Sequence, residues 1–157
     1  MNIGIIIYSQ TGHTLTVAQE IQKKIEAVGH SAKIDQVTIV GDAGPGARDV
    51  QFSNVPAVDD YDAVIFGSPV QAFSLAAPTA AYLNQIPSLQ DKRVACFVTK
   101  QLPFHWTGGN RAIRTMKNLC DAKGASICGT QIVVWSKSRR EESTRRCVDN
   151  LVKLFPA

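Results

Sequence analysis

The sequence predicts a doubly wound α/β domain, with a five-stranded parallel sheet in the middle of a three-layer α/β/α sandwich. Short apolar runs lie at residues 2–8, 63–67, 93–99 and 130–135, with a weaker run at 32–37. The strong runs are continuously apolar, which is typical of parallel strands covered on both faces. Helical patterns separate the runs. Right-handed crossovers then place helices on both faces and bring the carboxyl ends of the strands to one edge, where ligands bind.

Four helices are predicted from apolar stripes at helical spacing and from the residues at their ends. Pro78 suits a first helical turn, Gly29 suits a left-handed cap, and Ser138 with Glu141 forms a capping-box pair. The residues that mark their ends are Thr14 and Gly29, Pro78 and Pro87, the capping residue Asn110 and Gly124, and Ser138 and Phe155.

Residues 41–58 show no sustained period and are rich in glycine and proline, so we expect a loop or one short helix. Their glycines suggest a phosphate-binding P-loop at first glance. That motif ends in Gly-Lys-Ser/Thr, whereas Gly46 is followed by Ala47 and Arg48. The segment therefore carries no predicted nucleotide site.

Length and composition favour one domain that spans residues 1–157. No apolar run approaches the roughly 20 residues of a membrane span, and no basic leader precedes the first run. We therefore expect neither a signal peptide nor a membrane partner. The four cysteines have no metal-type spacing, which favours reduced thiols, no metal site and a cytoplasmic location.

The net charge of +4 comes largely from the last third of the chain, where basic residues stand close together. Such a cluster raises the alternatives of a nucleic-acid surface or an acidic-protein surface. The cluster lies on or beside a predicted helix whose other face is apolar, so we expect a solvated helix face and no nucleic-acid partner. The residues are Lys137, Arg139, Arg140, Arg145 and Arg146.

A polar segment follows the first apolar run and leads directly into the first predicted helix: Ser9-Gln10-Thr11-Gly12-His13-Thr14. Unpaired N–H groups and the positive dipole end at a helix amino terminus bind phosphate without Lys or Arg. Ser9, Thr11 and Thr14 add hydroxyl donors, and Gly12 lets the backbone approach closely. The alternative is a turn that only caps the helix. Three hydroxyls around one glycine exceed that need, so we predict a phosphate site.

This segment resembles the FMN-phosphate loop of the flavodoxin family, and the resemblance covers nearly the whole chain. Residues 59–70 (DDYDAVIFGSPV) are similar to that family's third strand and first flavin-ring loop. Residues 99–101 (TKQ) and 106–110 (WTGGN) are similar to its second ring loop. The resemblance implies a flavodoxin-like sandwich with strand order 2-1-3-4-5, and FMN as the cofactor. It implies as FMN-binding residues Ser9, Gln10, Thr11, Gly12, His13, Thr14, Ser68, Pro69, Val70, Gln71, Ala72, Phe73, Thr99, Lys100, Gln101, Trp106, Gly108 and Gly109.

The three segments follow strands one, three and four, so they should converge at one edge of the sheet. A flavin ring needs an apolar slot with backbone donors and acceptors at its polar edge. Residues 68–73 and 99–109 can supply both. Phe73, Phe104 and Trp106 are either stacking partners of the ring or core residues, whereas Trp135 is expected in the core.

No side chain is assigned to catalysis. His13 either touches the phosphate or is solvated, and His30 and His105 have no acidic companions at metal spacing. The acidic pair of response-regulator receivers, the Cys-x5-Arg loop of small phosphatases and the GxGxxG fingerprint are all absent from the sequence.

The first functional hypothesis is an FMN electron carrier that serves redox proteins or small electron acceptors. The second is an FMN reductase that takes hydride from NAD(P)H and passes electrons to a quinone or similar acceptor. The third is a non-redox binding module on the same fold. The oligomeric state stays open, a homodimer included. Because the chain is net positive, its second reduction step should be less reducing than in acidic flavodoxins.

Overall fold

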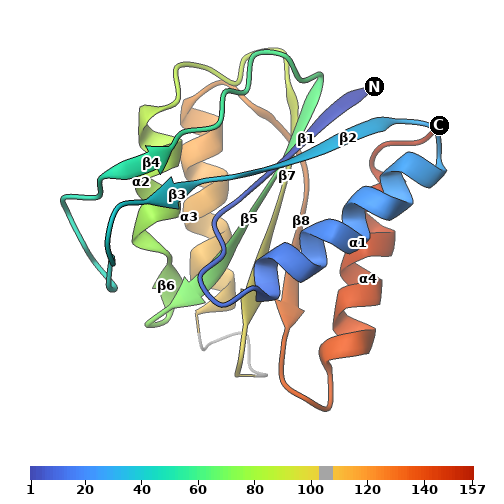
Figure 1. Cartoon of the computed structure of the whole chain (residues 1–157). Helices are drawn as coiled ribbons and strands as arrows, with labels where there is room; N and C mark the ends of the chain where they lie inside the picture. Colours follow the sequence, from blue (N-terminus) through green and yellow to red (C-terminus); the bar gives the residue numbers. More distant parts are fainter. Residues whose placement is uncertain (103–107) are drawn as a thin grey trace.

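The computed structural model describes residues 1–102 and 108–157, and its centre is a sheet of five parallel strands (Figure 1). The strand order β2-β1-β5-β7-β8 corresponds to 2-1-3-4-5 and confirms the predicted topology. The strand starting at Ser126 begins four residues before the predicted one. The bounds are β1 (Asn2–Ile7), β2 (Ser31–Gln36), β5 (Ala63–Gln71), β7 (Arg93–Lys100) and β8 (Ser126–Val134).

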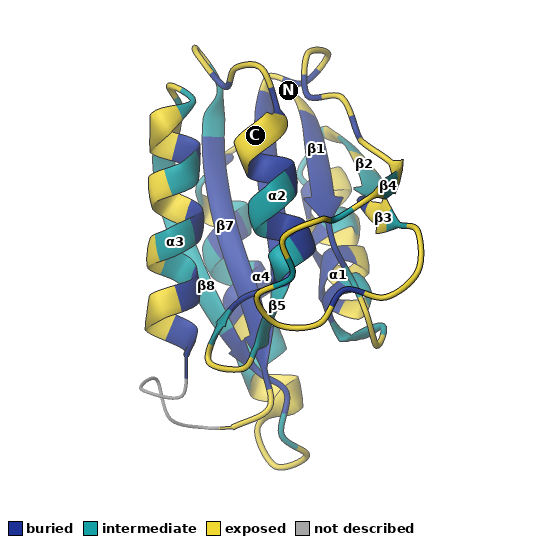
Figure 2. Ribbon diagram, turned by 90° about the vertical axis from the view of Figure 1, so that its left-hand side faces the viewer, coloured by how far each residue is buried: buried dark blue, intermediate teal, exposed yellow. Residues whose placement is uncertain are grey.

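In the described part of the chain, two helices cover each face of this sheet. In Figure 1, α1 (His13–Ala27) and α4 (Arg140–Lys153) lie on one face, and α2 (Ala77–Gln85) and α3 (Gly109–Ala122) lie on the other. Figure 2 shows the central strands β1, β5 and β7 as a mostly buried layer, whereas the edge strands β2 and β8 are largely of intermediate exposure and the outer sides of the helices are exposed. The three-layer sandwich expected from the continuous apolar runs is confirmed.

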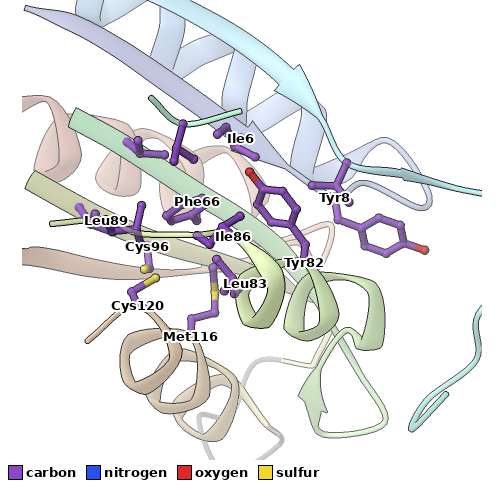
Figure 3. Close-up of a cluster of buried hydrophobic side chains, with 14 of the residues drawn as sticks. Ile6, Tyr8, Phe66, Tyr82, Leu83, Ile86, Leu89, Cys96, Met116 and Cys120 are labelled. Carbon is purple, nitrogen blue, oxygen red and sulfur yellow. The ribbon is translucent and has the colours of Figure 1, made fainter. Parts of the chain in front are cut away.

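The core forms two clusters because neighbouring strand residues point to opposite faces. Ile65 packs under α1 and α4, whereas the adjacent Phe66 packs under α2 and α3. Figure 3 shows the second cluster, in which Tyr82 of α2 lies near Phe66. The Tyr82 hydroxyl is buried and donates a hydrogen bond of 2.6 Å to the Pro56 carbonyl. The connection before β5 is thereby tied to the helical layer.

The expectation of a loop or one short helix at residues 41–58 is wrong for its last part. β3 (Thr38–Ile39) and β4 (Phe52–Asn54) form a small antiparallel sheet. The Asn54 side chain also donates to the Gln36 carbonyl at 2.6 Å. These contacts join residues about 15 positions apart, so local periodicity did not indicate them.

Two helix starts also differ from the prediction. The cap of α3 is Gly108 in the left-handed region, rather than Asn110, and the Ser138–Glu141 capping box does not form. Instead, Arg139 precedes α4, and the Ser136 carbonyl accepts the N–H groups of Arg139 and Arg140. A backbone turn replaces the side-chain cap.

No helix within residues 1–102 and 108–157 has the length and apolar character needed to cross a membrane. In the same part of the chain, no group of three or more metal-ligating side chains gathers. All four cysteines are free thiols.

Candidate functional site

Loops that follow β1, β5 and β7 meet at the carboxyl edge of the sheet, the lower end in Figure 1. Among the described residues, three hydrogen bonds join these segments. The Gln71 side chain donates to the Gln10 side chain at 2.6 Å. The Gln101 side-chain nitrogen lies 3.1 Å from His13 Nδ1. The hydroxyl oxygens of Thr14 and Thr99 are 3.0 Å apart. The predicted convergence of the three segments is therefore present in the structure.

The first loop presents unpaired donors at the amino terminus of α1. Gly12 precedes the helix with φ 91°, and no side chain caps it. Ser9 Oγ accepts the Leu15 N–H at 3.3 Å, whereas the N–H groups of residues 11–14 donate to no other described residue. A Cβ placed on Gly12 would meet nothing within 4 Å. The loop thus combines free N–H groups with open space, the requirements of an anion site.

Thr14 lies below this loop rather than on its surface. It is buried, and its hydroxyl is hydrogen-bonded to the buried Thr99. A hydroxyl has one donor and two acceptor positions. When Thr99 donates, the Thr14 proton is free for a group above it. Thr11 and Gln10, by contrast, are exposed at the edge.

The second loop is a tight hairpin between β5 and β6 (Ser74–Leu75). Its two turn residues, Ala72 and Phe73, have φ of 46° and 62°. This pattern matches a type I′ turn, which normally uses Asn or Gly because other side chains are strained at positive φ. Phe73 is also 54% exposed. An exposed aromatic held in a strained turn is a feature of binding loops.

Gly108, which precedes α3, packs closely against this hairpin. It has φ 107°, and a Cβ placed on it would lie 2.4 Å from the Phe73 Cα. Only glycine permits so close an approach together with this backbone conformation. The approach brings the start of α3 against the hairpin.

The remaining predicted residues of β5 lie in three different environments. Ser68 is completely buried and bonds to the Thr79 hydroxyl of α2 at 2.7 Å, so its side chain lies away from the edge. Pro69 and Val70 are half-buried nearer the hairpin. The Gln71 Oε1 atom is buried and has no hydrogen-bond partner among the described residues. An orphaned acceptor at this position can receive an N–H donor of a ligand.

Lys100 and Gln101 end β7 in different environments. Lys100 is 5% exposed, donates to the Leu102 carbonyl, and has its pKa lowered by burial. Its aliphatic chain packs near the buried Gly109. Gln101 is exposed and contacts His13. Trp106, together with Phe104 and His105, lies outside the described residues.

His13 and Trp135 form a stacked pair beside the first loop. Their ring centroids are 4.7 Å apart, and the Arg140 guanidinium lies 4.9 Å from the Trp135 ring. Desolvation, followed by the positive charge of Arg140, lowers the pKa of His13. Trp135 is buried as expected, but its support of the first loop was missed. Its place at the end of a strand, on the same edge as the other loops, was the available signal.

A hollow of about 200 Å³ lies on the other side of the first loop. Its lining includes Gln10, Ile39 and Asp42. Tyr8 also lines it, and burial, with the Asp42 carboxylate as a second cause, raises the pKa of this phenol. The first loop is thus open on the side that faces β3.

No family model matches this chain. "Protoplast secreted protein 2" of Saccharomyces cerevisiae is 28% identical over 130 residues, covering 74% of this chain and 63% of that protein. An "NAD(P)H dehydrogenase (quinone)" of Solidesulfovibrio magneticus is 27% identical over 96 residues, covering 54% of this chain and 47% of that protein. The chain therefore spans less than two thirds of the length of these curated relatives.

Solved structures show similarity over nearly the whole chain. Oxidised flavodoxin 2 of Bacillus cereus has a TM-score of 0.71 at 19% identity, covering 99% of this chain and 97% of that one. A flavoprotein in complex with FMN from Lactobacillus acidophilus has a TM-score of 0.66 at 18% identity, covering 93% and 97%. Two-electron reduced flavodoxin of Megasphaera elsdenii has a TM-score of 0.67 at 20% identity, covering 96% of this chain and 98% of that one. The chain has the flavodoxin-like fold, as the resemblance implied.

Proposed function

We propose that this chain binds FMN non-covalently at the carboxyl edge of its sheet and transfers electrons through it. The observation that carries the proposal is the convergence of three loops, with unpaired N–H groups of residues 11–14 at the start of α1. Phosphate is the common ligand of such a helix terminus. The neighbouring loops then receive the ring system.

The residues present fit the parts of FMN. For the phosphate, Ser9 and Thr11 offer hydroxyls beside the free N–H groups, and the space at Gly12 admits an oxygen close to the backbone. For the ring, the unpaired Gln71 Oε1 offers an acceptor, and the backbone of the hairpin and of Gln101 offers further polar groups. Phe73 offers an exposed aromatic surface.

When bound, FMN supplies one-electron and two-electron redox chemistry. The residues of the chain bind the phosphate, orient the ring and determine the charge around it. Hydrogen bonds from the loops and nearby cations such as Arg140 set how strongly each redox form is bound. No protein side chain is needed as a nucleophile or general base.

Flavodoxins and a flavoprotein in complex with FMN are among the similar solved structures. They support this proposal together with the general rule that doubly wound sheets bind ligands at the carboxyl ends of their strands, a rule that flavodoxin with FMN exemplifies. We propose redox proteins or small electron acceptors as partners. We also propose a cytoplasmic location, which the four free thiols support.

A second candidate function is an NAD(P)H-dependent FMN reductase of quinones or similar acceptors. The name of the Solidesulfovibrio relative favours it. Anaerobic mixing of the flavin-loaded protein with NADPH separates the two functions. Rapid bleaching of the flavin absorbance indicates the reductase, whereas an unchanged spectrum, with reduction by dithionite as the positive control, indicates the carrier.

The test of cofactor binding is an absorption spectrum of the purified protein, followed by mass analysis of the released cofactor. We expect a yellow protein that releases FMN. A colourless, folded protein that fails to bind added FMN would instead support the binding-module alternative.

A further inference from the structure

The strand β8 has an open hydrogen-bonding edge. It lies at the end of the sheet and, within residues 1–102 and 108–157, pairs with β7 alone. The Trp135 N–H donates to the Lys100 carbonyl at 2.7 Å, so the backbone N–H and C=O groups of Gln131 and Val133 also face β7. The backbone groups of Thr130, Ile132 and Val134 therefore face outward. The outward Val134 N–H is bonded to Ser143 Oγ at 2.8 Å. The outward backbone groups of Thr130 and Ile132 have no hydrogen-bond partner among the described residues.

The opposite edge of the sheet is protected, whereas β8 is not. β2 carries Lys33 and Asp35, and the Asn54 side chain bonds to the Gln36 carbonyl of its edge. Charged residues of this kind discourage the addition of another strand. β8 has no charged residue and no proline from Ser126 to Val134. A register shift disturbs its first part only, since regular pairing resumes at Gly129.

A groove of about 750 Å³ follows this edge between α3 and α4. Ile113 and Ile132 give it apolar lining, and Ser138, Arg139 and Arg146 give it polar lining. An extended segment that adds to a sheet edge needs this combination of backbone partners and side-chain pockets. Figure 2 shows β8 beside α3 and α4.

The last third of the chain, which contains α3, β8 and α4, carries the positive charge. Residues 109–157 contain ten Lys and Arg against four Asp and Glu, whereas residues 1–108 contain seven against nine. Arg146 pairs with Glu142 at 2.9 Å, but Arg139 makes no ion pair with another described residue. Arg139, Arg146 and Glu142 are the charged residues that line the groove, so its lining is net positive and complements a negatively charged occupant.

We propose that the β8 edge docks an extended, acidic segment of a partner protein, which adds a strand to the sheet. The Thr130 and Ile132 backbone supplies the hydrogen bonds of the added strand. Arg139 selects acidic side chains. The proposal uses no residue of the FMN site, so it stands or fails independently of the cofactor.

The probe is a fluorescein-labelled, nine-residue synthetic peptide of alternating glutamate and valine, measured by fluorescence anisotropy on the full chain. One control peptide has lysine in place of glutamate, and a second has alternate backbone amides N-methylated. We expect saturable binding of the first peptide only, weakened by salt. Equal binding of the lysine peptide, or undiminished binding of the N-methylated peptide, would refute the proposal.

Two pairs of variants locate the site. Thr130→Pro removes an outward N–H and should weaken peptide binding about tenfold, whereas Thr130→Val should leave it unchanged. Arg139→Glu should weaken binding about fivefold, and Arg48→Glu, the same charge change in an exposed remote loop, should not. Circular dichroism checks folding of every variant. If Thr130→Pro unfolds, Ile132→Pro and the N-methylated peptide decide the same question.

Two other occupants would overturn the proposal. A dimer in sedimentation analysis that Thr130→Pro dissociates would assign the edge to a second copy of this chain. Displacement of the peptide by a single-stranded oligonucleotide at equal charge concentration would assign the basic surface to nucleic acid.

Discussion

At the scale of single residues, the two threonines that join the first loop to β7 provide a direct test of the phosphate site. Thr14→Val removes the buried hydroxyl while keeping the shape of the side chain. We expect FMN binding to weaken about tenfold, because a hydrogen bond to a charged ligand is lost. Thr16→Val is the matched control, since the Thr16 residue is exposed and its hydroxyl has no described hydrogen-bond partner other than the Gly12 carbonyl. Equal losses in the two variants, measured by flavin fluorescence quenching, would contradict the assignment.

The close contact of Gly108 with the Phe73 backbone gives a prediction about stability and FMN binding. Gly108→Ala places a Cβ against the Phe73 backbone and also strains a residue at φ 107°. We expect the free energy of unfolding to fall by about 2 kcal/mol or more, and FMN binding to weaken. Gly46 also has a positive φ, 73°, but a Cβ placed on it would meet no atom within 4 Å. Gly46→Ala should therefore lower the free energy of unfolding by only about 1 kcal/mol and leave FMN binding unchanged. Urea denaturation measures both, and similar losses would argue against the loop contact.

The His13 ring gives a prediction about pH. Its pKa is lowered in the folded chain, first by desolvation and then by Arg140. The unfolded chain therefore binds a proton more readily, so stability falls as the pH drops below the ordinary histidine value. His13→Phe keeps an aromatic partner for Trp135 and removes the titration. We expect a flatter dependence of the urea midpoint on pH between 7.5 and 5.5 in this variant. Superimposable curves would contradict the inferred environment.

At the scale of elements, the β5–β6 hairpin combines strain with exposure. Phe73→Gly relieves a positive φ, so we expect the free energy of unfolding to rise by about 0.5 to 1 kcal/mol. If Phe73 contacts the flavin ring, the same variant should bind FMN more weakly. A variant that is no more stable and binds FMN equally well would remove both arguments.

The sequence predicted the elements that repeat a simple pattern. The central strands β1, β5 and β7 contain consecutive buried apolar residues, such as Ile5 and Ile6, because helices cover both faces of the sheet. The edge strand β2 contains Lys33 and Asp35, so its pattern was weaker. The β3–β4 pair was missed because its strands are short and pair across a long connection. The Ser138 capping box failed because a backbone turn at Ser136 starts α4 instead.

The site was predictable to the extent that it follows strand ends. Ser9 to Thr14 lie in sequence order at the helix terminus, so their grouping needed no tertiary information. Packing decided the rest: Ser68 bonds to Thr79, and Trp135 stacks on His13. Such contacts depend on which neighbour lies nearest after folding, and a local pattern does not contain that information.

At the scale of the whole molecule, the basic charge should affect the reduction potentials. The net charge is +4, and Arg140 lies near the first loop. Positive charge stabilises the more negatively charged reduced form of the cofactor. We expect the second reduction step to be less reducing than that of an acidic flavodoxin titrated under the same conditions, with the difference shrinking as salt is added. A potential as low as that of the acidic protein would contradict this.

The central claim is that backbone donors at the start of α1 hold the phosphate of FMN. Its most direct test is calorimetric titration of the cofactor-free protein with FMN and, separately, with riboflavin, which has the same ring and no phosphate. We expect FMN to bind at least about a hundredfold more tightly, since several charge-assisted hydrogen bonds distinguish the two ligands. Equal affinities, or no binding of FMN by the folded chain, would contradict the account.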